Sequence, residues 1–184
     1  MVFIINFIFE SYLYILLLRL LLQKMRAPFY NPLSQFIIKV TDPLVKPLQR
    51  MIPGVRGFDF AIVFLLVVLE IIALLLLIGL QFHTLPGALG GIIIVIAKLC
   101  HKVINVFFFA VIIGAIMSWF PTLQSGPVAE MVFLLSEPIL KPVRRWMPLI
   151  GGIDLSPLVV ILLLQLVSMA VISPLLKYGF QVAF

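Results

Sequence analysis

The chain has 184 residues, of which 64% are hydrophobic and 11% are charged, and its mean hydropathy is +1.28. This composition excludes a soluble globular domain, in which about half of the residues are apolar and about a quarter are charged. The net charge is +6, but no basic run has interleaved stacking aromatics, so the excess of Lys and Arg indicates loops that face anionic lipid rather than a nucleic-acid surface.

Four apolar stretches predict transmembrane helices over about 3–22, 60–80, 102–119 and 157–176, because a helical crossing needs about 20 apolar residues. The first has neither a basic start nor a small-residue cleavage site, so we expect it to be retained as a helix. The third stretch is over-long, since a helix over 88–120 would measure roughly 50 Å against a hydrocarbon core of roughly 30 Å. We therefore expect a linker over 83–96 with a short interfacial or re-entrant piece that extends to about residue 97, and a tilted third helix that includes 88–97 stays open as an alternative.

An internal repeat organises the chain. A shift of 95 residues aligns PLSQFIIKVTDPLVKPLQRMIPGVRGFD from Pro32 with PVAEMVFLLSEPILKPVRRWMPLIGGID from Pro127, with eight identical Pro, Gly and charged positions. The repeated unit is a helix, a Pro-rich segment and a second helix, over 1–82 and again over 97–184. Each unit crosses the membrane twice, so both units have the same orientation. The fold class predicted is an all-α membrane protein with four transmembrane helices, arranged as two parallel helical-hairpin repeats.

The Pro-rich segments, 33–53 and 128–148, fall on the same side as ten of the 13 Lys and Arg residues. The other side carries only Lys98, Lys102 and Lys177 by this assignment. Because Lys and Arg gather in cytoplasmic loops, we expect both segments to be cytoplasmic and both termini to face outward from a bacterial inner membrane.

Each Pro-rich segment predicts a short, bent amphipathic helix at the membrane interface. Asp42 and Glu137 each stand before a proline, which is typical of a helix start, and Pro47 and Pro142 follow where a proline kinks a helix. The segments are either topogenic connections or a paired surface that docks lipid headgroups or another membrane protein. The candidate docking residues are Lys39, Lys46, Arg50, Lys141, Arg144, Arg145 and Trp146.

Further polar residues fall at the ends and in the middle of the predicted spans. Asp59 and Asp154 each follow a glycine and precede an apolar span, so we expect both to cap helices. Ionisable and amide side chains near the midplane either hydrogen-bond helices together or form a cation or proton pathway. This intramembrane set is Glu10, Glu70, Asn105 and Gln165.

No motif in the chain indicates catalysis. His83 and His101 are isolated from each other and from any nearby carboxylate, and no phosphate-binding glycine loop, nucleophile elbow or CxxC motif occurs. We expect a protein that is not an enzyme, with no cofactor and no metal site.

The sequence resembles the YggT family, which includes the YlmG group of bacterial and plastid membrane proteins. The matching residues are LLLRLLLQ from Leu16, FYNPLSQF from Phe29, KVTDPLVKPLQRMIP from Lys39, AIMSWF from Ala115, SEPILKPVRRWMP from Ser136 and GGIDLSPL from Gly151. Glu137 departs from the Asp that is usual before this proline. The resemblance implies links to osmotic-stress tolerance, to cell division or envelope organisation and, in plastid relatives, to assembly of a cytochrome complex, and it implies no catalytic residues.

Two functional hypotheses from different classes follow. The first is a non-enzymatic organiser or assembly factor for other membrane, division or envelope components, which binds anionic lipid headgroups and another membrane protein or complex. The alternative is an ion or osmolyte pathway that uses Glu10 and Glu70. A subunit of a larger complex and a homo-oligomer both stay open.

Overall fold

The computed structural model describes residues 2–54, 57–82, 85–147 and 154–184. The described chain folds as helices joined by short connections: α1 (Val2–Lys24), α2 (Pro32–Met51), α3 (Phe60–Phe82), α4 (Ala88–Trp119), η1 (Pro121–Leu123), α5 (Pro127–Trp146), α6 (Ser156–Val167), η2 (Ser168–Ile172) and α7 (Ser173–Ala183). Four helical segments are long and apolar enough to cross a membrane, namely α1, 60–80 of α3, α4, and the continuous rod formed by α6, η2 and α7. The all-helical fold class and the four candidate spans agree with the sequence prediction.

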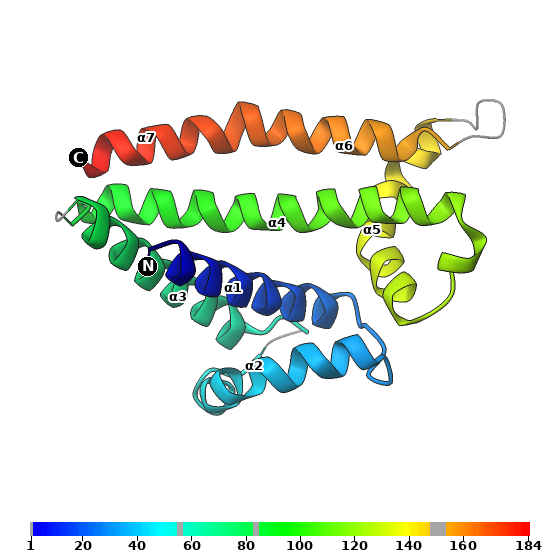
Figure 1. The fold of residues 1–184 in the computed structure, drawn as a ribbon, viewed down its shortest axis with the longest axis horizontal. Coiled ribbons are helices and arrows are strands. Elements are labelled where there is room, and N and C mark those ends of the chain that lie inside the picture. Colours follow the sequence, from blue (N-terminus) through cyan, green and yellow to red (C-terminus); the bar gives the residue numbers. More distant parts are fainter. Residues whose placement is uncertain (1, 55–56, 83–84, 148–153) are drawn as a thin grey trace.

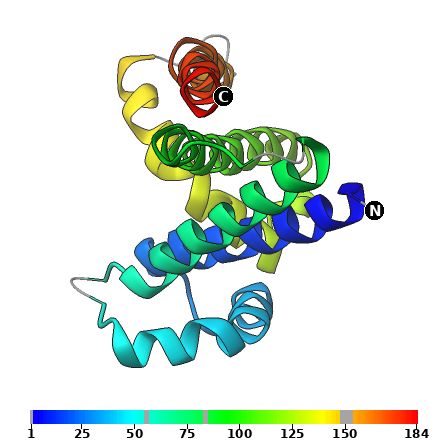
Figure 2. The same cartoon turned by 90° about the vertical axis from the view of Figure 1, so that its left-hand side faces the viewer.

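Helix α4 is the central layer of the molecule. The α6–α7 rod runs alongside one side of α4, and α1 and α3 pack on the other side (Figures 1 and 2). The largest buried cluster joins leucines of α1 and α3 to Val106 of α4 and Leu135 of α5. The core of the first half is therefore continuous with that of the second half.

The separate piece expected over 88–97 is not present, because these residues are the first turns of the unbroken α4. Close packing against α7 explains the difference: a Cβ on Gly90 would lie 2.4 Å from the backbone nitrogen of Ala183, and one on Gly179 would lie 2.9 Å from Ile94. Two glycines thus let α4 and α7 approach closely, and Ile94 and Val95 on one face of the start of α4 are buried in the same cluster as Ala183. The linker residues 83–84 lie outside the described residues.

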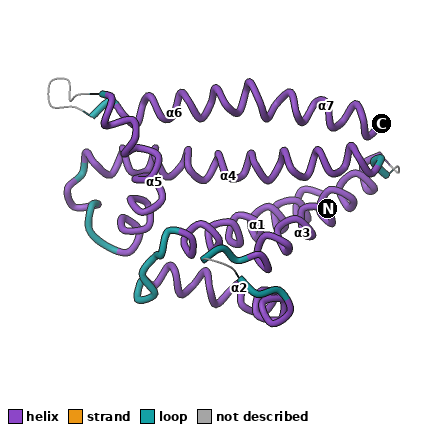
Figure 3. Tube along the Cα trace, turned by 180° about the vertical axis from the view of Figure 1, so that it is seen from behind, coloured by secondary structure: helices purple, strands orange, loops and turns teal. Residues whose placement is uncertain are grey.

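Helices α2 and α5 differ from the four long segments because each has one polar face, and each contains two internal prolines. Figure 2 shows α2 turning sharply along its length, and Figure 3 shows the same bend from behind. A proline inside a helix removes one backbone donor and clashes with the preceding turn, which accounts for the bend. Both helices lie near the end of the bundle where α1 and α4 finish, and the two chain termini lie near the other end (Figure 1).

Candidate functional site

Four charged side chains meet in the middle of three long helices and form what we call the ion cluster: Glu10 of α1, Glu70 of α3, and Lys98 and Lys102 of α4. Lys102 Nζ lies 2.8 Å from Glu70 Oε2 and 3.1 Å from both Glu10 carboxylate oxygens. Lys98 Nζ lies 3.0 Å from Glu70 Oε1 and 4.0 Å from Glu10 Oε1. Two cations thus bridge two carboxylates, and the charges balance.

Burial divides the ion cluster into an inner and an outer pair. The Glu70 side chain is fully buried and that of Lys102 is 4% exposed, whereas those of Glu10 and Lys98 are 29% and 26% exposed. Glu70 Oε1 accepts no well-directed hydrogen bond from the described residues, so Lys98 acts on it through charge alone. A buried carboxylate without a cation would be strongly unfavourable, and Lys102 supplies the closest compensation.

Glu10 and Glu70 lie within the candidate spans α1 and α3, and their partners are lysines rather than the amides Asn105 and Gln165. Asn105 donates to the Tyr14 hydroxyl at 3.2 Å, which joins α4 to α1 without a glutamate. Gln165 is exposed on α6. These partners, Lys98 and Lys102, both lie on α4.

Helices α2 and α5 meet at their first turns and form what we call the platform. Asn31 caps α2 by accepting from the Leu33 N–H, and its amide donates to the Pro127 carbonyl at 2.9 Å and to Glu130 Oε2 at 2.8 Å. The neighbouring Tyr30 hydroxyl donates to Glu130 Oε1 at 3.0 Å, and this hydrogen bond, followed by the Glu130 charge, raises the pKa of Tyr30. Asn31 is only 1% exposed, so one buried amide ties the two helices together.

The platform carries exposed basic and aromatic side chains. Lys46 is two-thirds exposed while it pairs with Asp42 at 2.7 Å, and Arg144 pairs with Glu137 and Asp154 at 2.8 Å each. Trp146 is 88% exposed at the end of α5. All the predicted docking residues are exposed, namely Lys39, Lys46, Arg50, Lys141, Arg144, Arg145 and Trp146, whereas residue 148 of the predicted segment lies outside the described residues.

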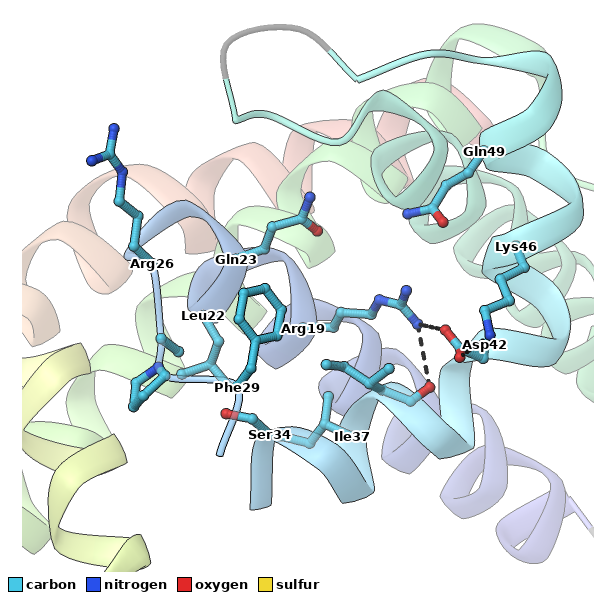
Figure 4. Close-up of a pocket in the computed structure, with 13 residues that line it drawn as sticks. Arg19, Leu22, Gln23, Arg26, Phe29, Ser34, Ile37, Asp42, Lys46 and Gln49 are labelled. Atoms are coloured by element: carbon cyan, nitrogen blue, oxygen red, sulfur yellow. Dashed lines mark hydrogen bonds and ion pairs between the residues drawn. The ribbon is translucent and has the colours of Figure 1, made fainter. Parts of the chain in front are cut away.

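Arg19 attaches α2 to α1 through hydrogen bonds and an ion pair. Its Nη1 donates to Thr41 Oγ1 at 2.6 Å. The same nitrogen donates to Asp42 Oδ1 at 2.9 Å and to the Ile38 carbonyl at 3.4 Å (Figure 4). The position 95 residues later is Gly114, where an added Cβ would lie 3.5 Å from Ser136 Oγ. In the first half, a buried arginine thus joins α1 to α2. In the second half, the equivalent position on α4 is a glycine that packs directly against α5.

The acidic residues before the spans receive backbone donors. Asp59 Oδ1 accepts from the N–H groups of Ala61 and Ile62 at the start of α3, and Asp154 Oδ1 accepts from the Ser156 N–H at the start of α6. The other Asp59 oxygen accepts from the Gln49 amide, and the other Asp154 oxygen accepts from Arg144 Nε. Gln49 and Arg144 are 95 residues apart, so equivalent positions tie each platform helix to the helix that follows it.

Asp42 and Glu137 do not cap helices, contrary to the sequence prediction. They lie in the interior of α2 and α5, which begin ten residues earlier at Pro32 and Pro127. Proline at the first helical turn, preceded by Asn31 or Gly126, is the pattern that could have located these starts. The interior acids instead pair with Arg19, Lys46 and Arg144.

Metal-binding side chains do not gather anywhere in the described part of the chain: no three His, Cys, Asp or Glu residues there are close enough to hold an ion. His101 contacts Ser168 Oγ at 3.4 Å. His83 lies outside the described residues.

Comparison with known proteins places these features in a family. The CCB3/YggT family model matches residues 1–81 and 93–175. The chain is 40% identical to an uncharacterized protein of Pseudomonas aeruginosa over 175 residues, covering 95% of this chain and 89% of the relative. It is 34% identical to the uncharacterized protein YggT of Escherichia coli over 177 residues, covering 96% of this chain and 92% of the relative. No solved structure matches. The resemblance indicated by the sequence motifs is confirmed.

Proposed function

Because this chain belongs to the CCB3/YggT family, we propose that it is a non-enzymatic, multi-pass inner-membrane protein that organises or assembles other membrane components. The family resemblance, with its links to osmotic-stress tolerance and to division or envelope organisation, favours such a role. The relatives named above carry no assigned activity that would point to catalysis.

The proposed architecture has two hairpin repeats of the same orientation, with the platform at the cytoplasmic surface and both termini outward. Equivalent contacts 95 residues apart, Gln49 with Asp59 and Arg144 with Asp154, support the repeat. The distribution of Lys and Arg supports the orientation. Lys98 and Lys102 are neutralised by glutamates within the ion cluster, so they do not count as cations of the opposite surface. Cationic side chains outside the spans therefore gather at the platform end, as the positive-inside rule requires of a cytoplasmic face.

The observation that carries the proposed role is that the first turns of α2 and α5 are joined. The Asn31 amide fixes the first turn of α2 against the first turn of α5, and the exposed basic side chains on the later turns of these two helices make up what we call the array. Lys and Arg stems can lie along apolar surface while their charges reach lipid phosphate or an acidic partner. A fixed spacing between two basic patches favours the recognition of one partner over general attraction to lipid.

Neutralising the array tests this proposal. We expect a variant carrying Lys46→Gln, Arg50→Gln, Lys141→Gln and Arg145→Gln to insert into membranes normally but to lose recovery of a stoichiometric partner from detergent extracts. Lys177→Gln, which removes an exposed cation on α7 at the other end of the bundle, is the matched control and should recover the partner as wild type does. Full partner recovery by the fourfold variant would refute the proposed docking surface.

An ion or osmolyte pathway is the second candidate function, and the ion cluster is the observation that favours it. Ionisable side chains at the middle of membrane helices are expensive, so a functional role is the default expectation for them. Glu10 and Lys98 are the partly exposed members from which an ion would enter. Flux through liposomes that contain the purified chain, abolished by Glu10→Gln with Glu70→Gln, would support this function. Absence of flux in the wild-type protein would reject it.

A further inference from the structure

A cavity of about 790 Å³ lies between the end of α1, the loop that follows it and α2. Figure 4 shows its polar side, where the side chains of Arg19, Gln23, Lys46 and Gln49 surround the space, and Arg26 stands at its edge. Leucine and isoleucine side chains form part of the remaining wall. The cavity therefore combines cationic groups with apolar surface at the end of a helix that could span the membrane.

Positive charge exceeds negative charge around this cavity. Arg19, Arg26 and Lys46 line it, and Asp42 is the one carboxylate among its described lining residues. All the hydrogen bonds of Arg19 to described residues run through Nη1, and its second terminal nitrogen points into the space near Gln49 (Figure 4). Asp42 is already shared between Arg19 and Lys46. The remaining N–H groups of Arg19 are therefore available to donate hydrogen bonds to an anionic ligand.

Arg26 has an unusual backbone conformation for an arginine. It lies two residues after the end of α1 with φ at +56°, and the Ala27 N–H donates to the Leu22 carbonyl at 2.8 Å across it. This helix ending normally has glycine at the left-handed position, because a Cβ there is strained. Strained residues often mark functional sites. The Arg26 side chain is exposed and makes no hydrogen bond or ion pair with the described residues, so a ligand at the cavity edge can recruit it.

We propose that this cavity binds the phosphate-bearing headgroup of an anionic phospholipid, with its acyl chains lying along the apolar wall. The inference rests on the proposed position of the platform at the membrane surface, where lipid phosphates lie. Lipid is favoured over free phosphate because part of the wall is apolar and the volume greatly exceeds that of one phosphate group. Arginine pairs with phosphate through charge-assisted hydrogen bonds, and Lys46 adds a second charge.

A second cavity supplies an internal comparison. It has a volume of about 820 Å³ and is lined by Glu137, Lys141 and Arg144, which are 95 residues beyond Asp42, Lys46 and Gln49 of the first cavity. There Glu130 adds a second carboxylate, so two acids balance two cations. The equivalent of Arg19 is Gly114. The preference for an anionic headgroup should therefore belong to the first cavity.

Lipid binding to the purified full-length chain tests the proposal without any protein partner. In native mass spectrometry we expect phosphatidylglycerol to bind at least about fivefold more tightly than phosphatidylcholine. Lys46→Gln and Arg26→Gln should each reduce phosphatidylglycerol affinity about fivefold, whereas Lys141→Gln in the second cavity should reduce it by about twofold or less. Arg26→Gly should lose lipid affinity while raising the thermal unfolding temperature, because glycine relieves the strain. This variant separates binding from folding.

Three outcomes would overturn the proposal: equal affinity for the two lipids, an equal effect of Lys46→Gln and Lys141→Gln, or displacement of phosphatidylglycerol by millimolar inorganic phosphate. The last result would identify a free-anion site instead of a lipid site. A failure of the lipid-binding proposal is distinguishable from a failure of the proposed function, because the first is measured by lipid affinity of the purified chain and the second by recovery of a protein partner.

Discussion

Lys102 Nζ lies 2.8 Å from Glu70 Oε2 in the middle of the helical bundle, and this contact joins α4 to α3. The same ammonium group reaches Glu10 of α1 at 3.1 Å, so one lysine holds three long helices together. Lys98 completes the neutral ion cluster one helical turn away on α4. The simplest consequence is that the cluster is a structural joint, and its energetics can be measured.

Lys102→Met should be strongly destabilising, because it leaves the fully buried Glu70 with only the more exposed Lys98. Breaking a buried ion pair by removing one partner costs about 3–5 kcal/mol. The double variant Lys102→Met with Glu70→Leu should recover much of this loss, and Lys98→Met should cost less than Lys102→Met. Thermal unfolding in detergent compares these variants with Glu70→Leu alone and with the wild-type protein, and strictly additive effects of Lys102→Met and Glu70→Leu would contradict a direct joint.

Gly90→Ala should destabilise the contact between α4 and α7, because the new methyl group would lie 2.4 Å from the Ala183 nitrogen. Overpacking of this kind costs about 1–3 kcal/mol. Gly91→Ala is the matched control, since its methyl group would meet only Pro86 at 3.9 Å. That control should keep or slightly raise stability through better helix propensity. Equal unfolding temperatures for the two variants would argue against the close packing.

The ion cluster and the helix starts show how far the sequence alone could go. Hydropathy and spacing were enough to place Glu10 and Glu70 inside spans, but pairing them with Lys102 requires the rotation of α4 about its axis, which local sequence does not specify. Asn105 and Gln165 hold the repeat-equivalent positions of the two glutamates, and equivalence under the repeat does not mean contact. An acidic residue before a proline is typical of a helix start, which is why the sequence predicts one at Asp42, whereas α2 bends and continues through both of its internal prolines.

Asn31→Asp should separate the platform helices while keeping the cap of α2. The carboxylate can still accept from the Leu33 N–H, but it cannot donate to the Pro127 carbonyl, and it would face the Glu130 carboxylate. Asn31→Ala should lose both functions, with the cap alone worth about 1 kcal/mol. Hydrogen exchange should therefore increase at the start of α5 in both variants and at the start of α2 only in Asn31→Ala. Unchanged exchange in α5 would mean that the bridge does not hold the helices.

Acid should release the link between α5 and the start of α6. Burial raises the pKa of Asp154, but hydrogen bonds from Ser156 and Arg144 outweigh it and leave that pKa below its usual value. A depressed carboxyl pKa contributes stability that is fully present above the ordinary value of about 3.9 and is lost as pH falls through the lowered folded value. Protection factors for hydrogen exchange at the start of α6 should fall below about pH 4, and Asp154→Asn should remove this dependence. An identical pH profile in that variant would exclude Asp154 as its source.

Site-specific photo-crosslinking tests the central claim, that α2 and α5 present one docking surface, most directly. A photo-crosslinking amino acid would replace Leu44 of α2, Trp146 of α5 or, as control, Tyr178 of α7, which are 46%, 88% and 58% exposed. The proposed platform predicts a protein adduct of the same mass at Leu44 and Trp146 in intact cells, and none of that mass at Tyr178. Absence of a shared adduct at the two platform positions, or its appearance only at Tyr178, would contradict the account.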